Sequence, residues 1–212
     1  MKNLIAILAI ALYCSIASAQ WTVGPKVAIG SVIQSQSDFR ILPMSDHGIY
    51  DLTFTGGTSV RSIGLMAYRE LGPFFLQTEV LGTTYGQTYK LDNFRKSDIA
   101  TPEYKDEFYI LEIPITAGIV IQKNFKLGVG HVLEILADKK SDFSALPYYK
   151  DTSKNIDHGF QLMLGYHIGA FHVDMKYVNR FSSIADGFNF GSDDMKLNKS
   201  ANRLTVSLGV AF

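Results

Sequence analysis

The sequence predicts an all-β fold, an eight-stranded antiparallel up-and-down transmembrane β-barrel, on three observations. In the last nine residues Leu204, Val206, Leu208, Val210 and Phe212 alternate with small or polar residues, as a strand with one apolar face requires. Seven further segments show the same period of two. The connections between the eight segments are alternately tight and long, which is typical of a barrel whose two ends differ.

The eight expected strands cover residues 21–33, 59–70, 74–85, 105–121, 125–137, 158–168, 171–181 and 201–212. Most have at least the roughly 9–11 residues that a tilted strand needs to cross the hydrocarbon of a membrane. Tight connections fall at residues 71–73, 122–124 and 169–170, and long ones at 34–58, 86–104, 138–157 and 182–200. Strict alternation places the long loops at one end and both termini with the tight turns. Short periplasmic turns and long extracellular loops are typical of the bacterial outer membrane, where we expect this chain.

The first 19 residues are expected to be a signal peptide, which leaves residues 20–212 as one barrel domain. Lys2 opens the segment, an apolar stretch follows at residues 4–12, and Ala17-Ser18-Ala19 forms a cleavage site. This order disfavours the alternative, a buried N-terminal helix, and the stretch is too short to span a bilayer of about 30 Å. The single cysteine, Cys14, lies in this segment, so we expect no disulfide in the mature chain.

The mature chain is close to neutral in charge. Without Lys2, 19 basic and 20 acidic residues remain, a net charge of −1. This balance offers no basic excess that would attract nucleic acid. No uninterrupted apolar run of helix-spanning length follows residue 20, so a membrane protein with this sequence must be a closed barrel.

The direction in which the apolar faces point decides between two kinds of barrel. A lipocalin-like secreted barrel would turn them inward, and a membrane barrel turns them to lipid. The polar faces hold small residues with one or two charges per strand, which suits a narrow lumen better than a water-facing surface. We therefore expect the apolar faces outward, with interfacial aromatic girdles formed by Trp21, Phe74, Phe75, Tyr85, Tyr109, Phe171, Phe181 and Phe212.

Two features fit this arrangement poorly. Pro25 and Pro114 lie within expected strands and each removes a ladder donor, so we expect β-bulges there. Residues 59–70 show no clean alternation, because Arg61 shares a side with Ile63 and Leu65.

The polar faces carry four cations and four anions at two depths. Lys26, Glu79, Asp174 and Lys176 are expected near the tight-turn end, and the other four about nine or ten residues from it. Unpaired charges are costly in a narrow lumen, so a neutral set predicts mutual ion pairs. We expect Glu112 and Glu134, on adjacent strands, to face Arg180 and Arg203 across the barrel. A salt-bridged plug is favoured, and a proton or solute path remains the alternative. The predicted network consists of Lys26, Glu79, Glu112, Glu134, Asp174, Lys176, Arg180 and Arg203.

No catalytic, cofactor or metal site is expected. His131 is the mid-strand histidine on the outward side, and no serine lies beside it to complete a lipid-modifying triad. His167 and His172 flank a tight turn, but without a third acid or thiol they cap the lumen more readily than they bind metal. His47 and His158 fall at expected loop positions and carry no motif.

Residues 108–115, Phe-Tyr-Ile-Leu-Glu-Ile-Pro-Ile, resemble the Tyr-Leu-Glu-Ile-Pro-Leu signature of the PorT-like outer-membrane β-barrel family. Residues 75–80, 174–177 and 202–212 are similar to other strands of that family. The resemblance implies an eight-stranded outer-membrane barrel in which a proline at position 114 is tolerated. A member of the family is implicated in protein export across the outer membrane, which makes a secretion or envelope assembly the alternative role.

The sequence thus indicates a non-enzymatic outer-membrane barrel with a structural or interaction role. The expected partners are outer-membrane lipid and a protein contacted through the long loops, and the barrel is expected to be monomeric. A lipid-modifying enzyme is the third alternative. The aromatic residues of the loops either contact a partner or the lipopolysaccharide layer or pack on each other: Phe39, Tyr50, Phe94, Tyr104, Tyr148, Tyr149, Phe188 and Phe190.

Overall fold

The computed structural model describes residues 21–33, 38–41, 50–93, 103–145, 149–151, 155–181, 188–190, 193–195 and 202–212. The expected signal peptide, residues 1–19, lies outside these residues, as do Phe94 and Tyr148. Within the described ranges, no helix has both the length and the apolar character to cross a membrane.

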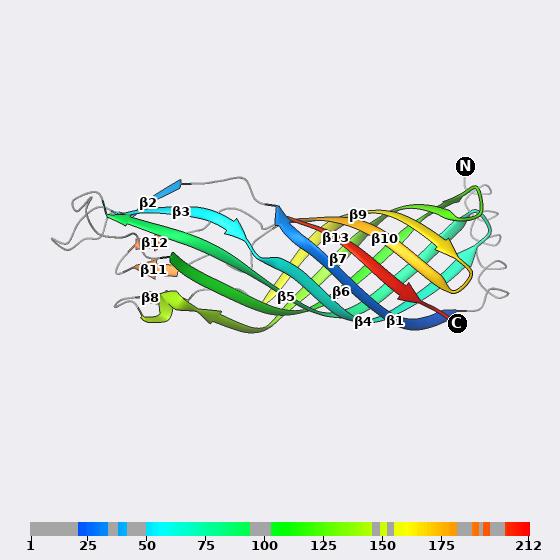
Figure 1. The fold of residues 1–212 in the computed structure, drawn as a ribbon, viewed down its shortest axis with the longest axis horizontal. Helices are drawn as coiled ribbons and strands as arrows, with labels where there is room; N and C mark the ends of the chain where they lie inside the picture. Colours follow the sequence, from blue (N-terminus) through cyan, green and yellow to red (C-terminus); the bar gives the residue numbers. More distant parts are fainter. Residues whose placement is uncertain are drawn as a thin grey trace, which may run out of the picture.

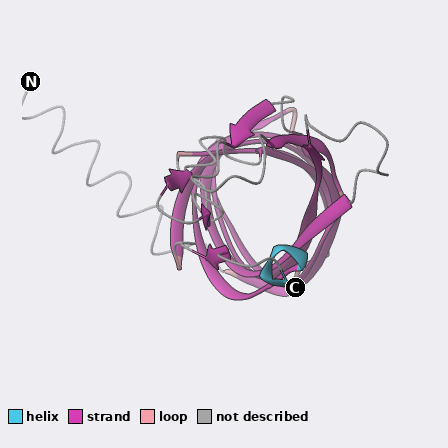
Figure 2. Ribbon diagram, turned by 90° about the vertical axis from the view of Figure 1, so that its left-hand side faces the viewer, coloured by secondary structure: helices cyan, strands magenta, loops and turns pink. Residues whose placement is uncertain are grey.

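Eight long strands form a closed antiparallel barrel, which confirms the predicted fold (Figures 1 and 2). They are β1 (Thr22–Ile33), β4 (Ser59–Leu71), β5 (Phe74–Asn93), β6 (Glu103–Ile121), β7 (Phe125–Ser141), β9 (Ile156–Ile168), β10 (Phe171–Arg180) and β13 (Asn202–Val210). Each strand pairs with the next in chain order, and β13 pairs with β1 to close the ring. The topology is therefore a simple up-and-down meander.

The three predicted tight turns lie at one end of the barrel. Gly72 and Gly169 have φ values of 65° and 56° in two of them, a conformation that a glycine adopts at no steric cost. The described chain also begins and ends at this end (Figure 1). The amide of Val23 donates to the carbonyl of Phe212 at 3.2 Å, and the amide of Phe212 donates back at 3.3 Å.

At the opposite end, part of the barrel wall continues as a protruding sheet (Figure 1). β5, β6 and β7 run past the barrel, β3 (Tyr50–Gly57) pairs with β5, and β2 (Asp38–Ile41) pairs with β3. A short 3₁₀ turn, η1 (Asp142–Ala145), follows β7. A separate small sheet contains β8 (Tyr149–Asp151), β11 (Phe188–Phe190) and β12 (Asp193–Met195).

The prediction of four long irregular loops was therefore wrong in part. Residues 86–93, 103–104 and 138–141 belong to strands. Apolar alternation reveals only strands with one apolar face, whereas backbone pairing also sustains a strand whose outward side chains are polar, such as Asp138 and Lys140. In the protruding sheet Tyr104 stacks on Phe143 with ring centroids 4.8 Å apart, so this loop aromatic packs internally.

The apolar faces of the strands point outward. In β10, Phe171 and Val173 are 57% and 46% exposed, whereas Asp174 between Val173 and Met175 is 0% exposed. β4 follows the same rule, because Arg61, Ile63 and Leu65 all point outward. Arg61 therefore shares a side with Ile63 and Leu65, as the sequence indicated, and the burial of the side chains alternates along the strand.

Two members of the expected aromatic girdles are misplaced. Phe75 and Tyr85 point into the lumen and are buried, because each follows an outward residue by one position. Phe74 and Phe171 remain outward and exposed near the tight turns.

The expected bulges at Pro25 and Pro114 were also wrong. Both prolines keep the regular register, opposite Leu65 and Val132. Beside Pro114 the β5–β6 ladder lacks pairs between Thr78 opposite Ile115 and Leu81 opposite Glu112, and then resumes in the same register. A proline removes a hydrogen-bond donor but adds no residue to the strand. The ladder therefore loses pairs locally and no bulge is needed.

Candidate functional site

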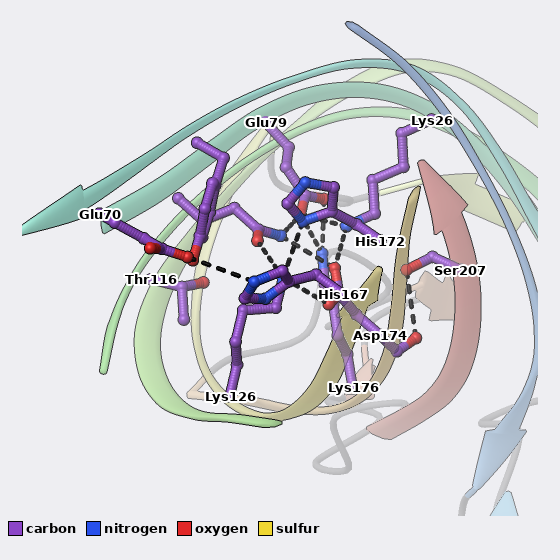
Figure 3. Close-up of polar contacts among 12 residues, drawn as sticks. Lys26, Glu70, Glu79, Thr116, Lys126, His167, His172, Asp174, Lys176 and Ser207 are labelled. Carbon is purple, nitrogen blue, oxygen red and sulfur yellow. Dashed lines mark hydrogen bonds and ion pairs between the residues drawn. The ribbon is translucent and has the colours of Figure 1, made fainter. Parts of the chain in front are cut away.

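The half of the lumen near the tight turns holds a buried set of charges, here named the lower cluster: Lys26, Glu79, Lys126, Asp174 and Lys176 (Figure 3). Lys26 Nζ lies 2.8 Å from Glu79 Oε1 and also pairs with Asp174. Lys176 pairs with Glu79. All five side chains are nearly inaccessible to solvent, so each charge is stabilised by its partners and not by water.

Lys126 belongs to this cluster although the sequence analysis did not single it out. Its Nζ lies 3.1 Å from Asp174 Oδ1, 3.3 Å from Gln77 Oε1 and 3.0 Å from His172 Nδ1. The signal was present, because Lys126 shares the inward parity of Gly128 and Gly130. With Lys126 included, three ammonium groups face two carboxylates.

An aromatic cap covers the lower cluster on the side of the tight turns; it consists of Tyr68, Phe75, His167 and His172. Lys126 Nζ lies 4.8 Å from the ring centroid of Tyr68, close enough for a cation–π contact. The His172 ring packs edge-on against Tyr68 at 4.8 Å. Together these rings separate the lower cluster from the tight-turn mouth.

His167 and Glu70 lie at the outer side of this cap. The Tyr68 hydroxyl donates to Glu70 Oε1 at 2.6 Å, and His167 Nε2 lies 3.4 Å from the same oxygen. His167 and His172 stack with centroids 5.8 Å apart, and His172 already contacts Lys126. Among the described residues no group of three histidine, cysteine or acidic side chains could hold a metal ion.

Neutral polar pairs separate the lower cluster from a second set of charges. Thr83 donates to Ser62 at 2.8 Å, and Gln161 donates to Thr116. These four side chains are also buried. Neutral polar contacts thus lie in the interior between the two sets of charges.

The second set, named the upper cluster, comprises Glu112, Glu134, Arg180 and Arg203. The Arg203 guanidinium pairs with both Glu112 and Glu134, and Arg180 pairs with Glu134. Glu134 therefore forms ion pairs with two arginines, which come from β10 and β13. The eight residues of the predicted network all lie in the two clusters, four in each.

Tyr85 completes the upper cluster from β5. Arg180 Nη1 lies 2.7 Å from the Tyr85 hydroxyl, and both guanidinium carbons lie over the ring at 5.0 and 5.4 Å from its centroid. The ring stacks on Phe108 at 5.1 Å on its other side. The sequence analysis assigned Tyr85 to an aromatic girdle. Tyr85 lies an odd number of residues after the outward Phe74, however, and so points into the lumen.

A histidine pair lies on the outer face of the barrel. His131 Nε2 and His158 Nδ1 are 3.2 Å apart on β7 and β9. The pair was not predicted, although His158 begins the expected strand at residues 158–168 and belongs to β9. In the ladders, Ile115 and Phe160 stand opposite His131, so these register neighbours supply no nucleophilic hydroxyl.

No protein-family model matches the chain, and no curated protein matches it. The arrangement has a clear chemical character: two clusters of ion-paired side chains lie in the interior, and apolar side chains cover the outside.

Proposed function

We propose that this chain is a non-enzymatic outer-membrane β-barrel with a closed, salt-bridged lumen and a structural or interaction role. The observation that carries the proposal is that the outer and inner faces of the barrel wall differ in chemical character. Apolar side chains on every barrel strand are exposed outward, while charged side chains between them are buried inward. A wall of this kind suits lipid outside and a polar interior.

The soluble alternative fits the two faces poorly. A lipocalin-like barrel holds its apolar ligand in an apolar interior. Here the interior contains the lower and upper clusters, and the outside includes Ile63 at 69% and Ile168 at 63% exposure. Soluble monomers rarely expose contiguous apolar patches larger than a few hundred Å². Sucrose-gradient fractionation and heat-modifiable gel mobility test the location and the barrel.

The paired interior supports a closed lumen over a conducting one. An open pore needs a hydrated path, whereas the nine charged groups of the two clusters are buried against one another. Planar-bilayer recording of the pure protein tests this. We expect no sustained current from the native chain, and steady open-channel currents would contradict the plug.

The non-enzymatic assignment is supported by the surroundings of His131. A hydrolytic triad requires a hydroxyl or thiol within hydrogen-bond reach of the histidine. Incubation with labelled phospholipid and lipopolysaccharide should give no turnover. Turnover that disappears in His131→Asn but persists in the tight-turn variant Lys123→Gln would instead establish a lipid-modifying enzyme.

A component of a secretion or envelope assembly is the second candidate. Two observations favour it: the sheet that protrudes past the barrel, formed by β3, β5, β6 and β7, and the PorT-like resemblance of residues 108–115. Loops and sheet extensions on a rigid scaffold are suited to contacting partners. Affinity purification from native membranes tests it. A stoichiometric protein partner favours the assembly, and recovery of the barrel alone favours the structural role.

A further inference from the structure

A hollow of about 260 Å³ opens on the side of the barrel where β3 ends and β4 begins. Thr58 interrupts the two strands, and its amide donates to the carbonyl of Gly86 at 2.8 Å. Ser59 and Thr84 line the hollow with Thr58, so three hydroxyl groups border it. The strand break therefore leaves a polar recess in an otherwise continuous wall.

Two cations flank this recess, Arg61 from β4 and Lys105 from β6. Lys105 Nζ lies 2.6 Å from Glu107 Oε1, so the two side chains form an ion pair. Glu107 is thus already occupied by Lys105. Arg61 is exposed and makes no ion pair with another residue that the structure describes, so its guanidinium is available to a ligand.

The neighbouring outward side chains add a third cation and a second anion. Lys140 stands opposite Glu107 in the β6–β7 ladder, with its Nζ 5.3 Å from the centroid of Tyr109. Asp138 stands opposite Tyr109, and its Oδ1 accepts from the amide of Lys139. A third anion is Asp142, whose Oδ2 accepts from the amide of Lys105 at 2.9 Å. Three cations and three anions therefore surround the recess, so it is the guanidinium of Arg61, without an ion pair among the described residues, that suits it to an anionic ligand.

The recess lies at the upper border of the apolar wall. On the outward face of β4, Arg61 lies next to Ile63 and Leu65 on the long-loop side. On β6, Tyr109 lies next to Leu111 on the same side. If the wall is immersed in lipid, as the proposed function requires, this border meets the headgroups of the leaflet on the long-loop side. An arginine at that level satisfies its charge best with an anionic headgroup.

We propose that this recess binds a phosphate-bearing sugar headgroup of an outer-leaflet glycolipid. The Arg61 guanidinium can donate to two phosphate oxygens at once, and Lys105 adds a point charge on the opposite side. The hydroxyls of Thr58, Ser59 and Thr84 can bond sugar hydroxyls, and the Tyr109 ring offers a flat surface for a sugar. The inference rests on the proposed function and names the lipid that the wall selects.

The test is a lipid titration of the full mature chain in detergent micelles, read by native mass spectrometry. The probes are bisphosphorylated lipid A, fully dephosphorylated lipid A and phosphatidylglycerol. We expect bisphosphorylated lipid A to bind most tightly. Arg61→Gln combined with Lys105→Gln should weaken it by about tenfold or more, the loss of at least one charge-assisted hydrogen bond. The matched control Lys123→Gln removes an exposed lysine at the tight turns and should change nothing.

Three results would overturn the inference: equal binding of dephosphorylated lipid A, equal binding of phosphatidylglycerol, or unchanged affinity in the double variant. Complete displacement by millimolar inorganic phosphate would assign the recess to a free anion and not to a lipid. Heat-modifiable mobility is measured on the same preparations. A barrel that folds in lipid without preferring lipid A refutes only this site, whereas a chain that needs no detergent refutes the proposed function as well.

Discussion

Lys126 Nζ lies 3.0 Å from Nδ1 of His172, and this contact joins the lower cluster to the aromatic cap. An ammonium group has only donors, so the imidazole nitrogen accepts and its proton resides on Nε2. A neutral histidine therefore provides one of the two hydrogen-bond acceptors around Lys126, Gln77 provides the other, and Asp174 adds an ion pair. The excess ammonium of the cluster thus has a partner in each of these three side chains.

Replacement of His172 tests this contact. His172→Leu removes an acceptor from a buried ammonium and should lower the free energy of unfolding by about 1–3 kcal/mol. His172→Gln retains an acceptor oxygen and should lower it by less than half as much. The single tryptophan, Trp21, reports unfolding in urea by its fluorescence in lipid vesicles. Equal losses in both variants would show that packing, and not the hydrogen bond, explains the effect.

The lysines of the lower cluster should differ in their contribution to stability. Lys26 pairs with both Glu79 and Asp174, whereas Lys126 pairs with Asp174 and otherwise contacts neutral acceptors. Lys26→Met should therefore destabilise by about 3–5 kcal/mol, as expected for breaking a buried ion pair. Lys126→Met should have a smaller effect because three ammonium groups exceed two carboxylates. The reverse order in urea unfolding would refute this charge count.

Glu134 should contribute more than Glu112 in the upper cluster. Glu134 pairs with two arginines, whereas among the described residues Glu112 pairs with Arg203 alone. Glu134→Gln should therefore give the larger loss of unfolding free energy. A double-mutant cycle with Arg203→Met and Glu134→Gln should give a coupling of about 0.5–3 kcal/mol. A coupling of zero would mean that the two side chains do not act together in the folded barrel.

The alternation of apolar and polar residues, with the positions of the tight turns, was sufficient to predict the barrel and the order of its strands. Alternating residues such as Leu204, Val206 and Leu208 mark a wall with one apolar face, and the tight turns order the strands. Parity also brought Glu134 and Arg203 to the same side of the wall. Their pairing followed from the cost of burying isolated charges, which holds irrespective of the details of packing.

Other features escaped because they do not depend on apolar alternation. The strands of the protruding sheet are held by backbone hydrogen bonds, and their outward residues are polar, as at Lys140. Lys126 was not included in the predicted network, although it shares the inward face of the strand with Gly128 and Gly130. The proximity of His131 to His158 depends on the register between β7 and β9, which the chain leaves open until both strands are paired.

A charged residue placed on the apolar wall tests whether lipid surrounds it. Leu164 is 44% exposed on the outer face of β9, and Leu127 and Met175 stand opposite it on the adjacent strands. Leu164→Arg should destabilise the vesicle-embedded barrel by about 2–4 kcal/mol if the side chain lies in hydrocarbon. The control Thr88→Arg, on the protruding sheet, should have an effect near zero. Equal, small effects would indicate that water covers both positions.

Site-directed spin labelling in lipid vesicles tests the orientation of the wall most directly. Cys14 is the only cysteine and lies in the expected signal peptide, so single cysteines in the mature chain give unambiguous labels. Labels at Leu164→Cys and Met175→Cys should be relaxed by oxygen, which concentrates in hydrocarbon, and shielded from a water-soluble nickel chelate. A label at Lys123→Cys should show the opposite preference. Free access of the chelate to Leu164→Cys and Met175→Cys would contradict a lipid-facing wall.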